Sequence, residues 1–491
     1  MTDAETTILD SARYVRQIRP IDPAELVTYV GTEATIEWVR SVLREHAFDL
    51  GLIERADGTF VPVSENRMIP TRATVKKVPD WVDTVLEDLL CDRFGDAWHA
   101  GTTGDQLREA IRACKAAYFA DEPVIYDETT AIGYAIYHLP TSYATTRYVL
   151  GAVGPIGFES HTLRILEVGA GVGGSTIGLL DQVGSDCLLS YHVIESSEPA
   201  LTVLDALVAR EDRNVHWTID HATIEAASLA EEYDLIVCSK VVSELDDPRS
   251  VLDRLSDHLA ADGYVMIIEP ADERTSRCLR TIESDIVRNS ALGVYSPTIR
   301  LWSGRQPTTA DWSFDERPAI AIPTVQRKLD EGPRAGPENR DPATGEFVNV
   351  AVRYSYSMLR ADDRTRIDFR PRPKQWTPLA EVPNRISERL DVAVVKLSNS
   401  IAPDGANPVY VIGDGSQLVE HFAVQTVTNQ WNVALKHAAY GDVLLMRRVL
   451  ALWNDDEQAT NLVVDAESTI KAVPPTGIRR ATDSSPSTAG G

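Results

Sequence analysis

Cysteine is scarce in this sequence, and its spacing excludes the chemistry that cysteines usually share. The 491 residues include five, with no C-x-x-C pair among them: Cys91, Cys114, Cys187, Cys238 and Cys278. Scattered thiols argue against a disulfide framework and against a zinc site. We therefore expect reduced, mostly buried cysteines and no metal.

Long apolar runs are missing as well. None approaches the roughly 20 residues that a membrane span needs, so a soluble protein without a membrane partner is expected. The amino terminus, MTDAETTILDSARYV, is acidic. Since it has neither an apolar signal core nor the Arg-rich character of organelle targeting, we expect a cytoplasmic location.

Lysine is rare, whereas negative charge is abundant. Only nine of the 48 basic residues are lysines, and 73 acidic residues give a net charge of −25. An acidic surface repels phosphate, which on its own argues against nucleic acid. The same composition suits a cytoplasm of molar salt, where screening acts over roughly 3 Å. We favour this halophilic hypothesis, under which net charge says little about partners.

The hydrophobic pattern divides the chain into regions of different type. Residues 1–125 place apolar side chains at three- and four-residue spacing, which predicts an N-terminal helical domain. Residues 126–365 alternate short apolar runs with amphipathic segments, which is typical of a parallel sheet flanked by helices. A Pro- and Gly-rich excursion near 303–347 interrupts them. Short strands in 366–472 predict a β-rich, barrel-like domain. Residues 473–491 lack apolar periodicity, which predicts a disordered tail.

The stretch ILEVGAGVGGSTIG fits two ligand-binding templates at once. Gly169, Gly171 and Gly174 form the G-x-G-x-x-G of a dinucleotide site. With Gly173 in place of Gly174, they form the G-x-G-x-G of an S-adenosylmethionine (SAM) site. In both, glycine allows a sharp turn and close approach of a ligand. Glu195, placed to accept the ribose hydroxyls at the end of the second strand, also suits either ligand.

Three further features favour SAM. Glu167, just before the glycines, would face a pyrophosphate unfavourably but suits the ammonium and sulfonium of SAM. Capping of nearby amides is its alternative role. Asp220 ends a third strand, where methyltransferases commonly hold the adenine amino group. A fourth strand, a helix, a turn at Gly263 and a fifth strand follow, in an order that resembles class I SAM-dependent methyltransferases.

The fold class predicted is therefore α/β: a class I methyltransferase (Rossmann-like) sheet between an N-terminal helical domain and a C-terminal β-rich region. A dehydrogenase is the disfavoured alternative. The predicted cofactor is SAM, bound by Glu167, Gly169, Ala170, Gly171, Gly173, Glu195, Asp220, His221 and Ser239.

Several segments in order resemble one methyltransferase family. They are YAIYHLPTSYATTRYVLGAV, SKVVSEL, IIEPADERTSRCLR, YSYSMLRADDR and WNVALKHAAYGDVLL, spread over about 110–445. They are similar to the mitochondrial small-ribosomal-subunit assembly methyltransferases and their bacterial and archaeal relatives, and the acidic composition favours a haloarchaeal member. The resemblance implies an enzyme that methylates RNA, or protein, of the small ribosomal subunit. The alternatives are a SAM-binding assembly factor with weak or lost catalysis, and a small-molecule methyltransferase.

The sequence departs from that family where it typically carries cysteines for an iron–sulfur cluster. Ser296 and Ser313 stand in the matching stretch, and Cys278 is the only nearby thiol. Serine is a poor ligand for iron–sulfur iron. We predict no cluster.

The sequence names no catalytic residue. After the fourth strand, Ser239-Lys240-Val241-Val242 replaces the Asn/Asp-Pro-Pro-aromatic turn that amino-methylating enzymes often carry. Cys238 lies inside an apolar strand and is expected to be a core thiol. Lys240 and Glu244 either face the methyl pocket or form a charge pair on a helix surface.

Contact with RNA would need stacking side chains and local arginines rather than net charge. The aromatic candidates, for which core packing is the alternative, are Trp302, Trp312, Tyr354 and Tyr356. The basic candidates, for which solvated surface arginine is the alternative, are Arg147, Arg300, Arg305, Arg447 and Arg448.

Overall fold

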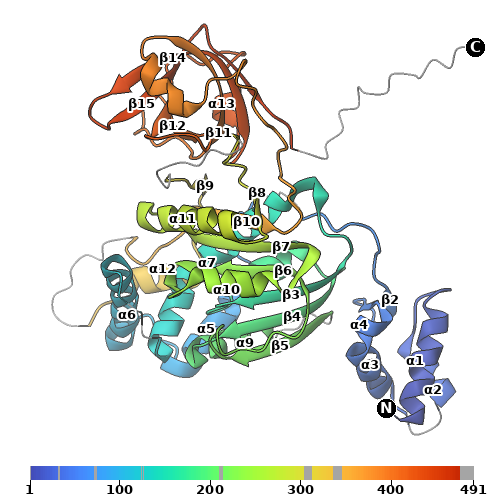
Figure 1. Ribbon diagram of the computed structural model, residues 1–491. Helices are drawn as coiled ribbons and strands as arrows, with labels where there is room; N and C mark the ends of the chain where they lie inside the picture. The colour runs from blue at the N-terminus through green and yellow to red at the C-terminus, as the bar shows by residue number, and fades with distance from the viewer. Residues whose placement is uncertain are drawn as a thin grey trace, which may run out of the picture. The chain divides into compact units, whose positions relative to one another are not determined.

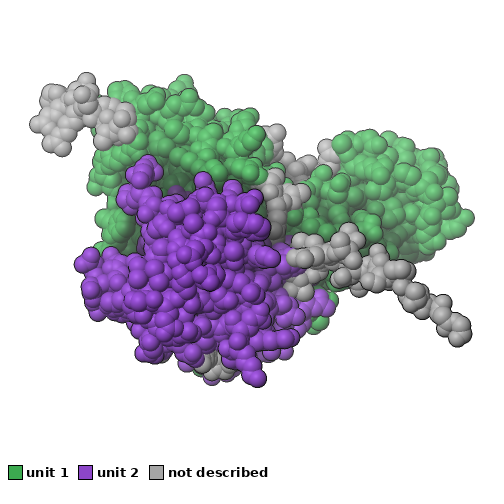
Figure 2. Space-filling model, turned by 90° about the horizontal axis from the view of Figure 1, so that it is seen from above, with its two compact units in different colours: residues 1–151, 158–269, 317–354 green, residues 152–157, 270–316, 355–491 purple. Residues whose placement is uncertain are grey.

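The computed structural model describes residues 2–30, 34–70, 74–122, 124, 126–209, 214–302, 312–335 and 345–475 (Figure 1). The chain divides into two compact units, coloured separately in Figure 2. Unit 1 comprises Met1–Gly151, Phe158–Glu269 and Arg317–Tyr354, and unit 2 comprises Ala152–Gly157, Pro270–Glu316 and Ser355–Gly491. Residues 476–491, most of the tail predicted to be disordered, lie outside the described residues.

The N-terminal part of unit 1 has a core of its own. Its elements are α1 (Asp3–Val15), α2 (Pro23–Val30), α3 (Ile36–Glu45), α4 (Ala47–Leu50), β1 (Leu52–Glu54) and β2 (Phe60–Pro62). Ile8, Leu26, Val39 and Phe60 are among the side chains buried together there. The antiparallel β1–β2 pair was not predicted, because three-residue strands are too short to show an alternating pattern.

Five parallel strands form the sheet of unit 1: β3 (Thr162–Val168), β4 (Leu188–Glu195), β5 (Val215–His221), β6 (Tyr233–Ser239) and β7 (Leu259–Pro270). Their order is β5-β4-β3-β6-β7, with β10 (Val352–Arg360) next. The apolar runs LRILEV, LLSYHVIE, NVHWTID, YDLIVCS and GYVMIIEP predict these five strands, each of which the structure contains. The α/β class I methyltransferase fold is confirmed. The order reverses direction at β3, and ligands bind at such switch points beyond the carboxyl ends of the strands.

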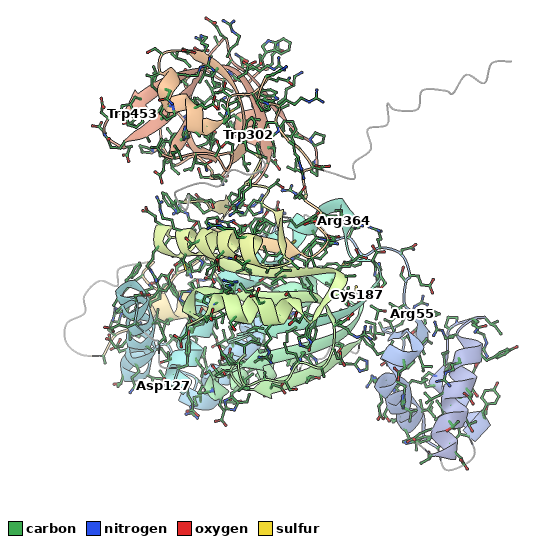
Figure 3. All side chains as sticks on the ribbon, in the orientation of Figure 1. Arg55, Asp127, Cys187, Trp302, Arg364 and Trp453 are labelled. Carbon is green, nitrogen blue, oxygen red and sulfur yellow. The ribbon has the colours of Figure 1, made fainter. Side chains whose placement is uncertain are left out.

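Helices pack around this sheet: α5 (Asp80–Phe94), α7 (Glu128–Leu150), α8 (Gly174–Val183), α9 (Glu198–Val208), α10 (Pro248–Ser256) and α12 (Thr324–Glu331). A further helix, α6 (Gly101–Ala120), packs against α7. The side chain of Asp127, labelled in Figure 3, caps α7 by accepting from the Thr130 N–H at 2.7 Å. Pro140 inside α7 cannot donate to the Ile136 carbonyl, and Gln326 Nε2 of α12 donates to it instead at 2.8 Å. Part of the predicted excursion near 303–347 is thus a packed helix.

Glycines bring α8 very close to α7. A Cβ on Gly178 would lie 2.6 Å from the Tyr143 carbonyl oxygen. Gly178→Ala is therefore expected to lower the free energy of unfolding by about 1–3 kcal/mol through overpacking, although alanine is about 1 kcal/mol the better helix former. Urea denaturation measures the change. Gly133→Ala in α7 is the control, because its Cβ would lie 3.4 Å from Ile111 Cγ1, an ordinary contact; equal losses in both variants would contradict the explanation.

Unit 2 contains a closed five-stranded β-barrel, which confirms the barrel-like region predicted from the sequence. β11 (Arg389–Lys396), β12 (Val409–Gly413), β13 (His421–Gln425), β15 (Ala459–Val464) and β14 (Val443–Asn454) follow one another, and β11 pairs with β14 to close the ring. β16 (Thr469–Ala472) adds to β14. The barrel encloses apolar side chains from alternate positions of its strands, including Val392, Val394, Ile412 and Leu444.

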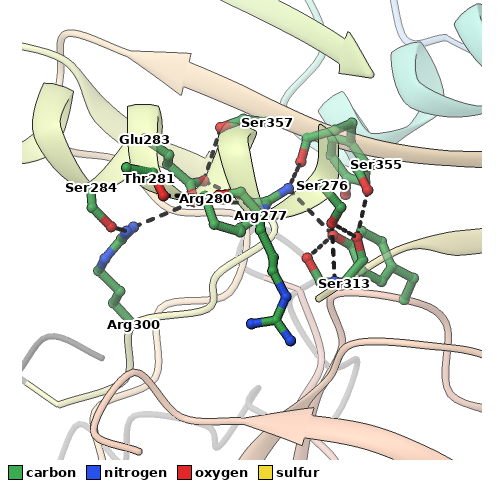
Figure 4. Close-up of polar contacts among 12 residues, drawn as sticks. Ser276, Arg277, Arg280, Thr281, Glu283, Ser284, Arg300, Ser313, Ser355 and Ser357 are labelled. Carbon is green, nitrogen blue, oxygen red and sulfur yellow. Dashed lines mark hydrogen bonds and ion pairs between the residues drawn. The ribbon is translucent and has the colours of Figure 1, made fainter. Parts of the chain in front are cut away.

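Outside the barrel, unit 2 holds α11 (Glu273–Asn289) and β8 (Gly293–Ser296), which pairs antiparallel with β10. The buried face of α11 carries a polar network that Figure 4 shows. Ser313 belongs to it, since its backbone N–H donates to Ser276 Oγ at 3.1 Å. Ser296 Oγ lies 2.7 Å from the Tyr356 hydroxyl. Both serines at the expected cluster positions are therefore packed in hydrogen-bonded interiors.

Across the described ranges, no helix is long and apolar enough to cross a membrane. The same residues contain no group of three or more His, Cys, Asp or Glu side chains that could hold a metal ion. All five cysteines lie within these ranges without a disulfide between any two, and Cys114, Cys187 and Cys238 are buried.

Candidate functional site

A cavity of about 430 Å³ opens in unit 1 beyond the carboxyl ends of β3, β4 and β6. Its wall comes from the glycine turn after β3, from residues 194–197 at the end of β4 and from residues 222–225 after β5. The wall is completed by residues 239–241 and 244–246, at and after the end of β6, by Tyr134 and Ser142 of α7, by Val124 and Tyr126 ahead of α7, and by Ala200 of α9. This is the switch point at which the strand order reverses.

The glycine turn needs glycine for two different reasons. Gly169 has a φ of +69°, and a Cβ there would lie 2.9 Å from Val241 Cγ2. Gly171 has a φ of +55°, and a Cβ there would meet nothing within 4 Å. Both conformations are left-handed and disfavour other residues. A side chain on Gly171 would therefore project into open space that a ligand needs, with Ala170 beside it on the wall.

Glu195 is a hydrogen-bond acceptor on the cavity wall, and two backbone N–H groups hold its carboxylate in place. Its Oε2 accepts from the Gly171 N–H at 2.8 Å, and its Oε1 accepts from the Ser197 N–H at 2.7 Å. Each carboxylate oxygen keeps a further lone pair. The backbone thus fixes the carboxylate beside the glycine turn, where it can accept from two neighbouring hydroxyl groups.

Glu167 is buried and does not line the cavity. Its Oε2 accepts from Thr176 Oγ1 at 2.7 Å and from the Tyr191 hydroxyl at 2.6 Å, so its partners are hydroxyls and not the amides of the alternative role. Oε1 is buried without a hydrogen-bond partner in the described structure. Burial raises the pKa of Glu167 to about 7, against the lowering effect of both hydrogen bonds. From this position the side chain ties β3 to β4 and α8.

This raised pKa predicts a specific pH dependence of stability. The protonated carboxyl stabilises the fold fully below its ordinary pKa of 4.5, and this contribution is lost as pH rises through about 7. Glu167→Gln stays neutral and keeps an acceptor for both hydroxyls. In the absence of ligand it is expected to match the parent at pH 4 and to exceed its free energy of unfolding at pH 8 by up to roughly 3 kcal/mol.

Denaturant titration at the two pH values measures this difference. Glu269, whose pKa burial also raises to about 7, titrates in the same window but equally in both proteins. A variant less stable than the parent at pH 8 would refute the assignment.

The remaining predicted site residues are divided between the wall and its surroundings. Ser239 lines the cavity. Asp220 instead lies 3.0 Å from His192 Nε2, and His221 Nε2 lies 3.0 Å from the Ser196 carbonyl oxygen. Gly173 packs against α9, where its Cβ would lie 2.6 Å from Leu204 Cδ1. Of the nine predicted residues, the cavity wall thus contains Gly169, Ala170, Gly171, Glu195 and Ser239 but not Glu167, Gly173, Asp220 or His221.

Lys240 and Glu244, which the sequence left between two roles, both line the cavity. Lys240 has a φ of +61°, a strained conformation for a residue with a side chain and one that gathers at functional sites. Its Nζ donates to Ser142 Oγ of α7 at 2.9 Å. Burial lowers the Lys240 pKa to about 8, although Glu269 and Glu244 act in the opposite direction. Burial likewise raises the pKa of Glu244.

Two tyrosines and the segment after β5 are wall residues that sequence reasoning missed. The rings of Tyr126 and Tyr134 meet edge to face with centroids 5.6 Å apart. Burial raises the pKa of both hydroxyls, so both side chains stay neutral. Tyr134 begins the segment quoted for the family resemblance, which was the available signal. Residues 222–225 follow β5 directly, after His221, but carry no motif.

Most candidates for RNA contact are engaged within their own unit. Trp302 is buried and donates from Nε1 to Asp414 Oδ2 at 2.7 Å. Tyr354 and Tyr356 are buried too, so core packing, the alternative role, describes these three. Trp312 is partly exposed and donates to the Ala271 carbonyl at 2.9 Å.

Four of the five arginine candidates have a partner within the described residues. Arg147 donates to the Tyr143 hydroxyl at 2.7 Å, and Arg300 to Ser284 Oγ at 2.6 Å. Arg447 lies over the Trp376 ring. Arg448 is exposed and pairs with Glu467 at 2.6 Å. Arg305 lies outside the described residues.

Three segments match known domain families. Residues 166–265 match a methyltransferase domain, and this range covers the glycine turn, Glu195 and Lys240. Residues 5–56 match the N-terminal domain, and residues 380–473 the C-terminal domain, of a domain of unknown function (DUF8157). The last two ranges coincide with the separate N-terminal core and with the barrel.

Curated relatives are far longer than this chain. A hybrid PKS-NRPS synthetase, pvhA, of Talaromyces variabilis is 26% identical over 273 residues, which is 54% of this chain and 6% of that protein. A highly reducing polyketide synthase, GPY1, of Gibberella fujikuroi is 27% identical over 126 residues, 25% of this chain and 5% of that protein. The chain thus spans less than a tenth of their length.

Among solved structures, the glycopeptide N-methyltransferase MtfA complexed with SAM is 22% identical, with 27% of this chain and 56% of that chain covered and a TM-score of 0.23. The N-methyltransferase NodS from Bradyrhizobium japonicum, in complex with S-adenosyl-L-homocysteine (SAH), is 21% identical, with 30% and 74% covered and a TM-score of 0.24.

Proposed function

We propose that this protein binds SAM in the cavity of unit 1 and transfers its methyl group to an acceptor. The observation that carries the proposal is the Glu195 carboxylate, held by the Gly171 N–H beside a turn that faces open space. The cavity volume lies in the range of small-molecule sites. Glu195 would accept from the ribose hydroxyls, and the glycine turn would allow close approach of the ligand.

SAM supplies a methyl group that is already activated, so the task of the chain is to position and to exclude water. Glu195 would fix the ligand at the end of β4. Tyr126 and Tyr134 present neutral rings to the cavity, and such rings attract a nearby cation. The residues present therefore fit a cationic ligand that carries two vicinal hydroxyls.

The first experiment is calorimetry with SAM and with NADH. We expect SAM to bind and NADH not to bind, because carboxylates of the wall repel a pyrophosphate. Those carboxylates belong to Glu195, Glu225, Glu244 and Asp246. Binding of NADH without binding of SAM would replace this proposal with the dehydrogenase alternative.

For the acceptor we propose RNA of the small ribosomal subunit, in a cytoplasm of molar salt. The family resemblance supports it, as do two folded parts beyond the methyltransferase match, residues 5–56 and 380–473. Because the turn after β6 lacks the amine-methylating motif, a factor that docks without turnover is the second candidate. The similarity to a hybrid PKS-NRPS synthetase and to a highly reducing polyketide synthase favours a small-molecule acceptor as the third candidate.

Radiolabelled SAM, added in molar potassium chloride to small-subunit precursors and to deproteinised RNA, distinguishes these candidates. Label in RNA supports the enzyme, and co-sedimentation without label supports the docking factor. Neither label nor binding, from protein that still binds SAM, rejects the ribosomal acceptor. Unfolding on addition of the salt would reject the halophilic part of the proposal.

A further inference from the structure

The cavity wall carries a carboxylate on one side of the glycine turn and a lysine on the other, although the stretch after β6 that holds Lys240 also contributes Glu244 and Asp246. β3 lies between β4 and β6, and the pairing places Val168 opposite both Ile194 and Cys238. The next residues along the three strands, Gly169, Glu195 and Ser239, therefore lie at one level, and Lys240 follows Ser239. Glu195 stands on one side of the glycine turn and Lys240 on the other. A ligand whose ribose contacts Glu195 extends its other end toward Lys240.

A hydrogen bond holds the Lys240 side chain in place, but no carboxylate forms an ion pair with its ammonium in the described structure. In the described structure its Nζ has one hydrogen-bond partner, Ser142 Oγ, and no ion-pair partner. The Glu269 carboxylate, from the end of β7, is occupied by the Ser243 N–H at 3.1 Å and by Ser243 Oγ at 2.9 Å. Glu244 faces the same part of the cavity after β6.

A further titratable group near Lys240, His138, comes from α7, and Tyr134 of the same helix lines the cavity. Burial lowers the pKa of His138 well below its ordinary value, and the charge of Lys240 lowers it further. His138 is therefore neutral and adds no charge to the surroundings of Lys240. The Lys240 ammonium is held mainly by a hydroxyl, an arrangement from which a proton is readily lost.

We propose that Lys240 is the proton acceptor of this site: it loses its own proton when a sulfonium occupies the adjoining turn, and the neutral amine then takes the proton that the methyl acceptor loses. The inference rests on the proposed binding of SAM in the same cavity. It defines the acceptor class as a neutral group that loses a proton on methylation, which is an O–H, N–H, S–H or acidic C–H group.

The step balances in atoms and charge. A bond forms between the acceptor atom and the methyl carbon while the carbon–sulfur bond breaks, and the electron pair of that bond stays on sulfur. The acceptor's proton moves to Lys240 Nζ. Before the step the single positive charge is on sulfur and the amine is neutral; afterwards sulfur is neutral and the charge is on the ammonium.

Proton release on SAM binding tests the inference without knowledge of the acceptor. Calorimetric titrations at pH 8, in phosphate and in Tris, give the number of protons released from the difference in heats. Because the Lys240 pKa is about 8, about half of the free protein carries this proton. The parent is therefore expected to release about half a proton more per SAM bound than Lys240→Met. Ionisation of free SAM is the same for both proteins and cancels.

Lys77→Met is the matched control, because Lys77 is an exposed lysine of the same unit paired with Asp80, and it should release protons like the parent. Equal release by the parent and by Lys240→Met overturns the inference while the proposed function stands. No binding of SAM to the parent defeats the proposed function itself.

A second variant keeps the test decisive if Lys240→Met folds poorly. Arginine stays protonated, so Lys240→Arg places a fixed positive charge near the sulfonium. We expect it to weaken SAM binding about tenfold or more and to change binding of SAH, whose sulfur is neutral, by less than about threefold. Equal losses for both ligands would overturn the inference, because they would show a steric effect and not an effect of charge.

Discussion

Glu195→Ala is expected to weaken SAM binding by roughly 10- to 150-fold, the equivalent of about 1.5–3 kcal/mol for hydrogen bonds to a charged group. The variant loses the carboxylate that would accept from the ribose hydroxyls. It also removes the acceptor of the Gly171 and Ser197 N–H groups, so the turn itself loses a restraint. Isothermal titration calorimetry of the parent and the variant measures the effect.

Two further variants separate the charge from the fold. Glu195→Gln should also bind weakly, because its amide NH₂ would face either the Gly171 or the Ser197 N–H, donor against donor. Glu198→Ala is the control, since Glu198 is exposed in the first turn of α9 and lies outside the cavity wall. Glu195→Ala that binds SAM within about twofold of the parent would contradict the site described above.

Glu283→Ala is expected to destabilise unit 2 by about 3–5 kcal/mol, because it leaves a buried guanidinium without its counter-charge. Arg280 Nη1 donates to both carboxylate oxygens of Glu283, at 3.0 and 2.9 Å, and both side chains are almost fully buried in the network of Figure 4. Ser357 Oγ donates to the same carboxylate at 2.9 Å. Chemical denaturation followed by fluorescence gives the change in free energy of unfolding.

The chain offers a matched exposed pair. Arg385 and Glu388 have the same spacing in the same unit and are 41% and 53% exposed, with their closest atoms 2.7 Å apart. Glu388→Ala should cost less than about 1 kcal/mol. The double variant Arg280→Met with Glu283→Leu should recover part of the stability, because Arg280 no longer leaves a charge buried alone, whereas Arg300 still loses the Glu283 carboxylate 3.6 Å from its Nη1. A loss below about 1 kcal/mol for Glu283→Ala would show that the pair is solvated in solution.

The family resemblance and the composition predicted the function and the cellular environment of the protein, and the structure tests these predictions only in part. The methyltransferase part of the resemblance is matched over residues 166–265, whereas the ribosomal acceptor and the halophilic character stay predictions. Ser296 and Ser313, the two departures from the family's cysteine pattern, lie in hydrogen-bonded interiors. Trp302 and Arg300 show why single candidates for RNA contact could not be chosen from the sequence. Whether such a side chain faces solvent depends on a hydrogen-bond partner in another segment, here Asp414 for Trp302 and Ser284 of α11 for Arg300.

The local sequence pattern was enough to predict the parallel sheet of unit 1 and two parts of the cavity wall, the glycine turn and Glu195. Apolar runs of strand length predicted β3 to β7, because periodicity depends only on neighbours in the sequence. The glycine spacing and the end of the second strand likewise predicted the turn and Glu195. Three-residue strands such as β1 (Leu52–Glu54) and motif-free segments such as residues 222–225 gave no such signal.

Only the tertiary structure decided which side chains at the strand ends face the cavity. Glu167 turns away because Thr176 and Tyr191 supply hydroxyl donors behind the wall, and Asp220 is held by His192. Lys240 turns inward because its backbone adopts a positive φ and Ser142 of α7 receives its Nζ. The sequence thus determined the strands, the glycine turn and the position of Glu195 at the end of β4. Non-local hydrogen bonds, which no spacing encodes, decided the rest of the site.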